Sequence, residues 1–174
     1  MTLLENLSAG RMRKKGLPTV REFLRLRWRP LSEQPLIEPP RFSPIIADPT
    51  FVPGALPQLS PDTLCPWMNL GAGAIKVIRL RDGYVCLQNG IYTDNRGNSG
   101  SAIYAIPSRD GRRWHSQNAR CVLAPDPEYA WRASHVYALD CRYVAREQRW
   151  YLFFNGRTTA HWSRGREAIG ALYA

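Results

Sequence analysis

The sequence predicts an all-β fold that is built from two copies of one antiparallel unit. Three segments recur at a single spacing of 66 positions: Asn89-Gly90 returns as Asn155-Gly156, Tyr84 as Trp150, and residues 102–105 as residues 168–171. Short apolar runs of strand length, separated by turn residues, surround each copy. Self-similarity at a fixed period is typical of propellers, solenoids and arrays. We therefore expect each unit to form one small sheet.

The first unit is expected to contain strands at residues 74–80, 84–87 and 101–106. Turns are predicted at Arg81-Asp82-Gly83, Asn89-Gly90 and Asp110-Gly111, because Gly, Asn and Asp favour tight connections between strands. The polar segment 94–98 fits a solvated hairpin tip, since it lacks the ligand spacing of a calcium loop.

The second unit repeats this order, with strands expected at residues 136–144, 150–154 and 167–173 and a turn at Asn155-Gly156. Three or four short antiparallel strands without an intervening helix describe a propeller blade better than a solenoid coil or a βαβ unit. We expect a partial β-propeller of about two to three blades. The counterpart of Trp114, which follows the first unit, would lie beyond Ala174, so the chain is expected to be a portion of a longer protein.

Residues 1–41 are expected to form a basic N-terminal extension and a proline-rich linker, ahead of a domain at residues 42–174. Apolar residues at helical spacing, with Thr19 as a cap, predict a short helix over residues 19–28. A helix packed on the surface is favoured over one that contacts a membrane or RNA. A short strand is expected at residues 45–47.

The formal charge of +10 is mostly a property of the N-terminal segment. Residues 1–30 hold eight basic and two acidic groups and so supply +6 of it. The chain has 21 Arg against 3 Lys, which base composition of the coding DNA explains more simply than phosphate binding. Aromatic residues do not interleave with the basic run, which argues against nucleic-acid binding.

The sequence predicts no metal, no cofactor and no membrane span. Cys65, Cys86, Cys121 and Cys141 form no C-x-x-C pair and have no His at metal-finger spacing, so free buried thiols are expected, with disulfides as the alternative that the even count allows. No secretory signal is present, and the longest strongly apolar run, residues 150–154, is far shorter than the roughly 20 residues that a span requires. A soluble, cytoplasmic protein is expected.

Four segments resemble the five-bladed β-propeller glycosidases of the arabinanase, xylosidase and invertase group. They are SPIIADP at residues 43–49, SRDGRRW at 108–114, VYALD at 136–140 and WYLFFNG at 150–156. The resemblance covers roughly residues 42–174 and implies the propeller fold more strongly than any activity, because active enzymes, transferases and sugar-binding relatives share these segments.

The resemblance also implies three carboxylates in a central funnel. Asp48 would be the base or nucleophile, Asp140 the residue that orients the acid, and Glu167 the proton donor. Cleavage of a glycosidic bond through an oxocarbenium-like transition state requires one ionised carboxylate and one neutral carboxylic acid. The family's proton donor would otherwise belong to a later blade, and Glu128 lies in a predicted loop.

Each of these carboxylates also has a purely structural interpretation. Asp48 fits a turn before a proline, and Glu167 fits a strand-edge salt bridge with nearby arginines. Asp140 fits an ion pair with Arg142 or Arg132. At the 66-residue spacing the counterpart of Asp140 is Ala74, which suggests that the strand does not require an acid at this position.

Five residues are candidates for substrate binding: Trp67, Arg132, His135, Arg142 and Trp162. Tryptophans stack on sugar rings, although in such folds they more often fill space between blades. The function expected is glycoside hydrolysis or glycosyl transfer on an oligo- or polysaccharide. The alternative is a non-catalytic carbohydrate-binding or assembly module, and the exposed β edges of an incomplete ring predict self-association.

Overall fold

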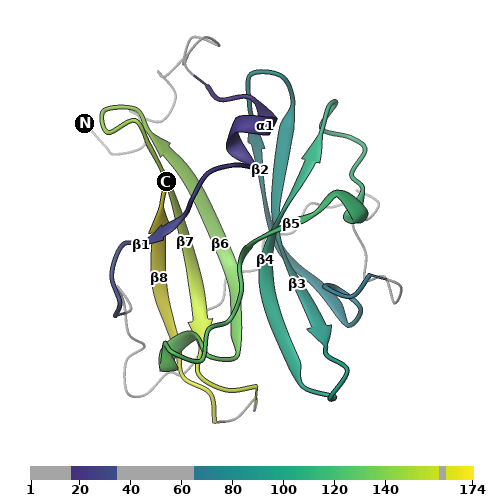
Figure 1. The fold of residues 1–174 in the computed structure, drawn as a ribbon, viewed down its shortest axis with the longest axis vertical. Helices are drawn as coiled ribbons and strands as arrows, with labels where there is room; N and C mark the ends of the chain where they lie inside the picture. The colour runs from purple at the N-terminus through teal and green to yellow at the C-terminus, as the bar shows by residue number, and fades with distance from the viewer. Residues whose placement is uncertain (1–16, 35–64, 161–163) are drawn as a thin grey trace, which may run out of the picture.

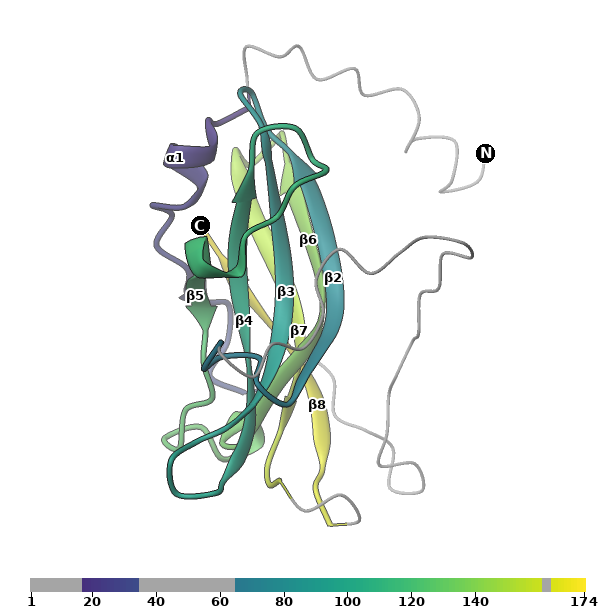
Figure 2. The same ribbon diagram turned by 90° about the vertical axis from the view of Figure 1, so that its right-hand side faces the viewer.

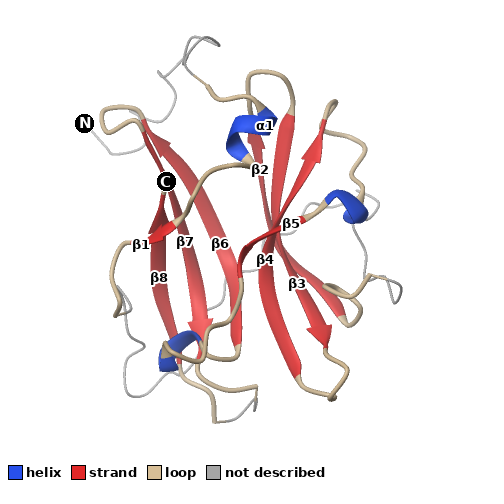
Figure 3. Cartoon of the chain, viewed as in Figure 1, coloured by secondary structure: helices blue, strands red, loops and turns tan. Residues whose placement is uncertain are grey.

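The computed structural model describes residues 17–34, 65–160 and 164–174. Eight strands in this part of the chain form one mixed sheet in the order β1-β8-β7-β6-β4-β3-β2, with β5 beside β4 (Figures 1 and 3). The strands are β1 (Arg29–Pro30), β2 (Gly71–Arg79), β3 (Tyr84–Thr93), β4 (Ser99–Ser108), β5 (Arg120–Leu123), β6 (His135–Val144), β7 (Arg149–Arg157) and β8 (Glu167–Tyr173). One short helix, α1 (Val20–Phe23), and 3-10 turns at Ser116–Asn118 and Ala130–Arg132 accompany them. The predicted all-β class is confirmed.

The sheet consists of two antiparallel groups of strands, which splay apart to the left and right in Figure 1. The first half contains β2, β3, β4 and β5, and the second half contains β6, β7, β8 and β1. A single parallel pair, Ser101 with His135, connects the two halves. The second half therefore takes its outer strand, β1, from the N-terminal part of the chain.

The two halves share one register, which confirms the repeat that the sequence predicts. Asn89 lies opposite Ile103 in the first half, and Asn155 lies opposite Ile169 in the second. The first strand of each half, β2 or β6, is interrupted by an irregularity in its pairing with the next strand. Duplication of the unit thus extends to the way that the strands pair.

The first strands of the two halves follow a slightly different spacing. Lys76 lies opposite Leu87, and Asp140 lies opposite Phe153. Leu87 and Phe153 stand 66 positions apart, whereas Lys76 and Asp140 stand 64 positions apart. The structural counterpart of Asp140 is therefore Lys76 and not Ala74, because the connection between the first and second strands is two residues longer in the second half.

The Asn-Gly pairs do not form the predicted turns. Asn89-Gly90 lies inside β3 and Asn155-Gly156 lies inside β7. A Cβ atom on Gly90 would come within 2.3 Å of Cε3 of Trp67, and one on Gly156 within 2.6 Å of Cε3 of Trp131. Each glycine is required because a tryptophan packs directly against the strand backbone, which is a tertiary reason that local turn propensity does not reveal.

The hairpin tip between β3 and β4 is at residues 94–98, as expected. The Asp94 carboxylate accepts hydrogen bonds from the backbone N–H groups of Arg96 and Asn98, at 2.8 Å each. Gly97 has φ 81°, a conformation that favours glycine. Local polar residues therefore close this hairpin.

The helix in the N-terminal segment is shorter than expected, and the segment packs more deeply against the sheet. Thr19 and Glu22 form a capping box, but α1 ends at Phe23 instead of continuing to residue 28. The Phe23 ring is 2% exposed and lies 5.0 Å from the Trp150 ring. Pro30 then pairs with Leu172 of β8. Residues 17–34 are thus part of the fold because an aromatic side chain anchors them, while the expected strand at 45–47 lies outside the described residues.

The hydrophobic core lies between the two halves and beneath α1. Its buried members come from both groups of strands: Phe23, Ile78, Leu80, Val85, Leu87, Ile103, Ala105, Leu123, Val136, Cys141, Trp150, Leu152, Phe154 and Leu172. Figure 2 shows α1 beside the upper ends of the strands. All four cysteines are free; Cys121 is exposed, which differs from the expectation of four buried thiols. No helix among the described residues is long and apolar enough to cross a membrane.

Candidate functional site

Four polar side chains gather at one end of the second half. His135, Arg157 and Glu167 lie directly opposite one another on β6, β7 and β8. Residues paired in this way project from the same face of a sheet. Tyr137 pairs with Asn155, two positions further along both strands, and so shares that face. We refer to His135, Tyr137, Arg157 and Glu167 as the polar row.

Two members of the polar row are buried charges. Arg157 and Glu167 are 7% and 4% exposed, and Nη1 of Arg157 lies 3.9 Å from Oε1 of Glu167. Moving charged groups out of water costs several kcal/mol per ion unless they are paired. Glu167 is thus in an ion pair, as the structural interpretation expects, although its partner here lies on the neighbouring strand.

His135 is half-buried and is more accessible than the charged pair of the polar row. Its Nδ1 lies 2.7 Å from Oγ of Ser134. Burial, followed by the Arg157 guanidinium, lowers the pKa of His135 below its usual 6.5, while Glu167 opposes this shift. The imidazole is therefore neutral at pH 7, with one nitrogen able to donate and the other able to accept a hydrogen bond.

Tyr137 places a phenol next to these charges. Burial, and next the Glu167 carboxylate, raise the pKa of the Tyr137 hydroxyl above its usual value of 10. The hydroxyl oxygen is buried and lies near Glu167, but no described group meets it with the geometry of a full hydrogen bond. The phenol thus stays protonated and keeps its hydrogen as a donor.

The first half of the sheet carries no such row. Small or apolar residues and one serine stand at the corresponding positions: Gly71, Gly73, Ile91 and Ser101. The Ser101 hydroxyl donates to the backbone carbonyl of Val136 at 3.0 Å. Because the same strand framework forms without the charged residues, the fold does not require the polar row.

Asp140 lies in a different environment, between two cations. Its Oδ1 is 2.6 Å from Nζ of Lys76, and its Oδ2 is 2.7 Å from Nε of Arg142. Partial burial would raise the pKa of the Asp140 carboxyl, but the hydrogen bonds and charges of Lys76 and Arg142 outweigh it and lower the pKa. The expected ion pair with Arg142 is present, and the carboxylate is ionised at neutral pH.

Asp140 and Glu167 are too far apart to act on one glycosidic bond. Asp140 pairs with Phe153, and Glu167 pairs with Arg157, four residues further along β7. Four strand residues span about 13 Å. The two carboxyl groups of a glycosidase are about 5 to 9.5 Å apart. A catalytic pair would therefore need a carboxylate other than these two.

Trp67 fills space beside the first half of the sheet. Its ring centroid lies 4.3 Å from that of Tyr104, and its indole lies against Gly90. Trp131 takes the equivalent place on Gly156 in the second half. This matched packing favours the space-filling interpretation over a role for Trp67 as a platform for sugar.

The other predicted site residues are dispersed. The Arg132 guanidinium lies 3.2 Å from the Asp126 carboxylate and 4.3 Å from the centre of the Tyr129 ring. Arg142 is exposed and engaged with Asp140, away from the polar row. Asp48 and Trp162 lie outside the described residues. The structure thus brings His135 and Glu167 together and separates them from Asp140 and Arg142.

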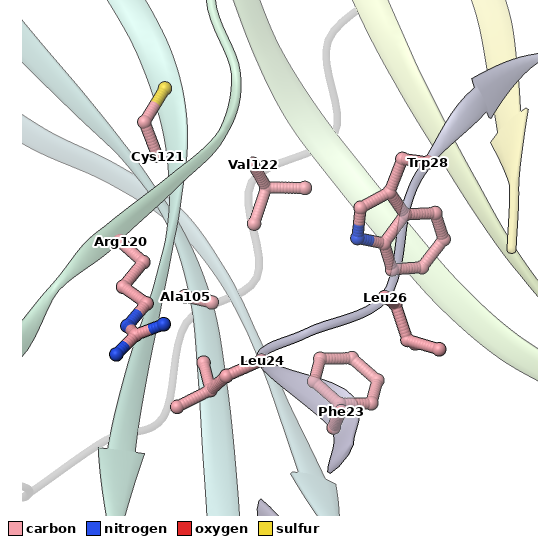
Figure 4. Close-up of a pocket in the computed structure, with 8 residues that line it drawn as sticks. All are labelled: Phe23, Leu24, Leu26, Trp28, Ala105, Arg120, Cys121 and Val122. Carbon is pink, nitrogen blue, oxygen red and sulfur yellow. The ribbon is translucent and has the colours of Figure 1, made fainter. Parts of the chain in front are cut away.

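A small cavity beneath α1 offers no alternative site for glycoside chemistry. Its volume is about 150 Å³, and it is lined by Phe23, Leu24, Leu26, Trp28, Ala105, Arg120, Cys121 and Val122 (Figure 4). The lining includes no carboxylate and no residue that the sequence singles out for a site. It is a packing gap between the helix segment and β5.

Sequence reasoning missed Tyr137 and Arg157. The signal for Arg157 was present, because its counterpart at the 66-residue spacing is Ile91, just as that of Glu167 is Ser101. Two adjacent strands therefore gain opposite charges at paired positions in the second copy. Such a double replacement in a repeat indicates a functional site, but it can be recognised only when the strand register is known.

No group of three His, Cys, Asp or Glu side chains suited to a metal ion occurs among the described residues. No protein-family model, curated protein or solved structure matches this chain. The interpretation of the polar row rests on its geometry and on the resemblance of four short segments to the propeller glycosidases.

Proposed function

We propose that this chain is a non-catalytic carbohydrate-binding module that holds a saccharide at the polar row. The observation that carries the proposal is the pairing of Arg157 with Glu167 at positions where the first half has Ile91 and Ser101. Buried charges are costly, so their presence in only one of two equivalent sheets favours a functional role.

The chemistry of the polar row suits sugar hydroxyl groups. Glu167 accepts hydrogen bonds, Arg157 donates them, and neutral His135 and protonated Tyr137 supply further groups of both kinds. Hydrogen bonds to charged groups contribute about 1.5 to 3 kcal/mol each. Half-buried His135 is the accessible member of the polar row, and a ligand would reach the buried Tyr137 hydroxyl and the buried pair past it.

Binding without hydrolysis is favoured over the glycosidase expected from the sequence. The polar row holds one carboxylate, and Asp140 lies about 13 Å further along the strands and is ionised. A glycosidase needs two carboxyl groups that flank the same glycosidic bond, about 5 to 9.5 Å apart. Glycoside hydrolysis with Asp48, Asp140 and Glu167 therefore stays a prediction of the resemblance.

The proposed fold follows from the same arrangement. Each half is a four-stranded antiparallel unit, and such units are typical of propeller blades. We propose that the halves correspond to two blades, with β1 as the outer strand of the second. The open sheet by itself supports only the all-β class.

The test is binding of the purified chain to an array of neutral and anionic glycans, followed by calorimetry on any ligand found. Tyr137→Phe should weaken binding about three- to tenfold, and Glu167→Gln about 10- to 100-fold. Tyr151→Phe is the matched control, because this hydroxyl bonds to Glu147 outside the polar row. Absence of binding by the wild type, or equal binding by all variants, would refute the proposal.

A further inference from the structure

Two apolar patches remain uncovered by described residues on the outer sides of the two halves. On β2, Ile75 and Val77 are 58% and 47% exposed. On β7, Phe153 is 37% exposed, and it lines a shallow groove with Tyr151, Leu31 and Val144, at whose edge the charged residues Arg142, Arg146 and Glu147 also lie. We call Ile75 and Val77 the front patch, and Tyr151, Phe153 and Leu31 the rear patch.

The front patch has buried counterparts in the second half. At the 64-residue spacing of the first strands, Val77 corresponds to Cys141 and Ile75 corresponds to Leu139. Cys141 is 4% exposed, and Leu139 packs against the same core cluster. The first half covers these residues of the second half, whereas no described residues cover their counterparts on β2.

The rear patch has buried counterparts in the first half. At the 66-residue spacing, Phe153 corresponds to Leu87 and Tyr151 corresponds to Val85. Both counterparts are 0% exposed and belong to the core cluster that Cys141 also joins. The molecule therefore exposes, on its two outer sides, the counterparts of the two surfaces that meet in its interior.

From this equivalence we propose that a second copy of the chain docks head to tail, with the rear patch of one copy on the front patch of the next. The contact would reproduce the packing between the two halves. The charges of the two surfaces are also complementary. Within one chain, Nζ of Lys76 lies 2.6 Å from Oδ1 of Asp140, and these two residues occupy equivalent positions in the two halves. In the new contact, Asp140 of one copy faces Lys76 of the next.

Such a contact joins two different surfaces, so it generates closed rings or open filaments and not an isologous dimer. Propeller rings contain about four to eight blades. Two blades per chain then give about two to four copies in a closed ring. The rear patch shares one face of the second half with the polar row, because Phe153 and Arg157 stand four positions apart on β7. The mass is therefore measured without saccharide, so that its outcome does not depend on the proposed binding function.

The experiment measures mass by size exclusion with light scattering for the wild type and two variants. Val77→Glu blocks the front patch, and Phe153→Glu blocks the rear patch. The wild type should have at least twice the chain mass of 19.8 kDa, and each variant alone should have 19.8 kDa. An equimolar mixture should form a heterodimer of twice the chain mass, because each variant retains the patch that the other lacks.

Leu70→Glu is the control, since Leu70 is 57% exposed and its counterpart, Ser134, is not in the core; this variant should assemble like the wild type. A wild type that remains at 19.8 kDa would overturn the proposal. So would single variants that still assemble, or a mixture that stays monomeric while both variants retain wild-type circular dichroism. Assembly of one variant alone would indicate an isologous contact instead.

Discussion

Lys76 and Asp140 occupy equivalent positions in the two halves of the sheet, and their side chains meet, with Nζ 2.6 Å from Oδ1. Arg142 binds the other carboxylate oxygen at 2.7 Å. One position in the repeat thus carries opposite charges in its two copies, and the resulting ion pair bridges the two halves at their first strands.

Asp140→Asn should destabilise the protein by only about 1 kcal/mol or less. The Lys76 and Asp140 side chains are 36% and 38% exposed, so solvent screens the pair. A double-mutant cycle with Lys76→Met, measured by urea unfolding, should give a coupling energy of about 0.5 kcal/mol. A coupling near zero would show that the two groups do not interact.

Asp140 should also contribute to acid lability. Because its pKa is lowered below 3.8 in the folded protein, its contribution is present above about pH 4 and is lost as the pH falls through the folded value. Asp140→Asn should therefore lose less stability than the wild type below about pH 4. Parallel unfolding curves for the two proteins at every pH would contradict this.

The lowered pKa of His135 predicts a second effect of pH on the stability of the protein, nearer to neutral pH. Since burial lowers its pKa, the unfolded chain binds a proton more readily, and stability falls as the pH drops from above 6.5 toward the folded value. Arg157 disfavours the imidazolium, whereas Glu167 favours it. His135→Gln should flatten the dependence of the unfolding free energy on pH in this window, and a variant with the same pH dependence as the wild type would contradict this.

Gly90→Ala should destabilise the first half by roughly 1 to 3 kcal/mol or more, because the new methyl group would overlap Trp67. Thermal or urea unfolding measures the loss. The double variant Gly90→Ala/Trp67→Ala should lose somewhat less than the sum of its single variants, since truncation removes the overlap with the ring but leaves the overlap with the backbone carbonyl oxygen of residue 67. Additive losses would mean that the indole does not lie against this glycine.

Aryl-glycosides should remain intact when they are incubated with the wild-type chain, because Asp140 and Glu167 lie about 13 Å apart along the strands, further than the two carboxyl groups of a glycosidase. Release of the aryl group, followed by absorbance, is the measurement. Hydrolysis that is abolished by Asp48→Asn and by Asp140→Asn would contradict the binding proposal and support the glycosidase expected from the resemblance.

Strands and the repeat could be predicted because they depend on local patterns. β8 occupies residues 167–173, the range that alternation and turn residues indicate, and β6 begins one residue earlier than expected. Asn89-Gly90 and Asn155-Gly156 were mistaken for turns because the tryptophans that require glycine there come from distant segments. Local propensity carries no record of such packing.

The polar row was only half predicted. His135 and Glu167 were identified by residue type, whereas Arg157 and Tyr137 become partners only when the register of β6, β7 and β8 is known. Register depends on how whole strands pair, and a shift of one residue would move each side chain to the opposite face. The ion pair between Asp140 and Arg142 was predicted from the sequence. The ion pair between Asp140 and Lys76 was not, because Lys76 lies in the other half of the sheet.

The shared register of the two halves underlies both the polar row and the proposed assembly, and cross-strand nuclear Overhauser effects between backbone protons test it most directly. We predict that Asn89 shows contacts to Ile103, and Asn155 shows matching contacts to Ile169, in the middle of long strands. Contacts that place either Asn-Gly pair at the tip of a hairpin, or different pairings in the two halves, would contradict the account.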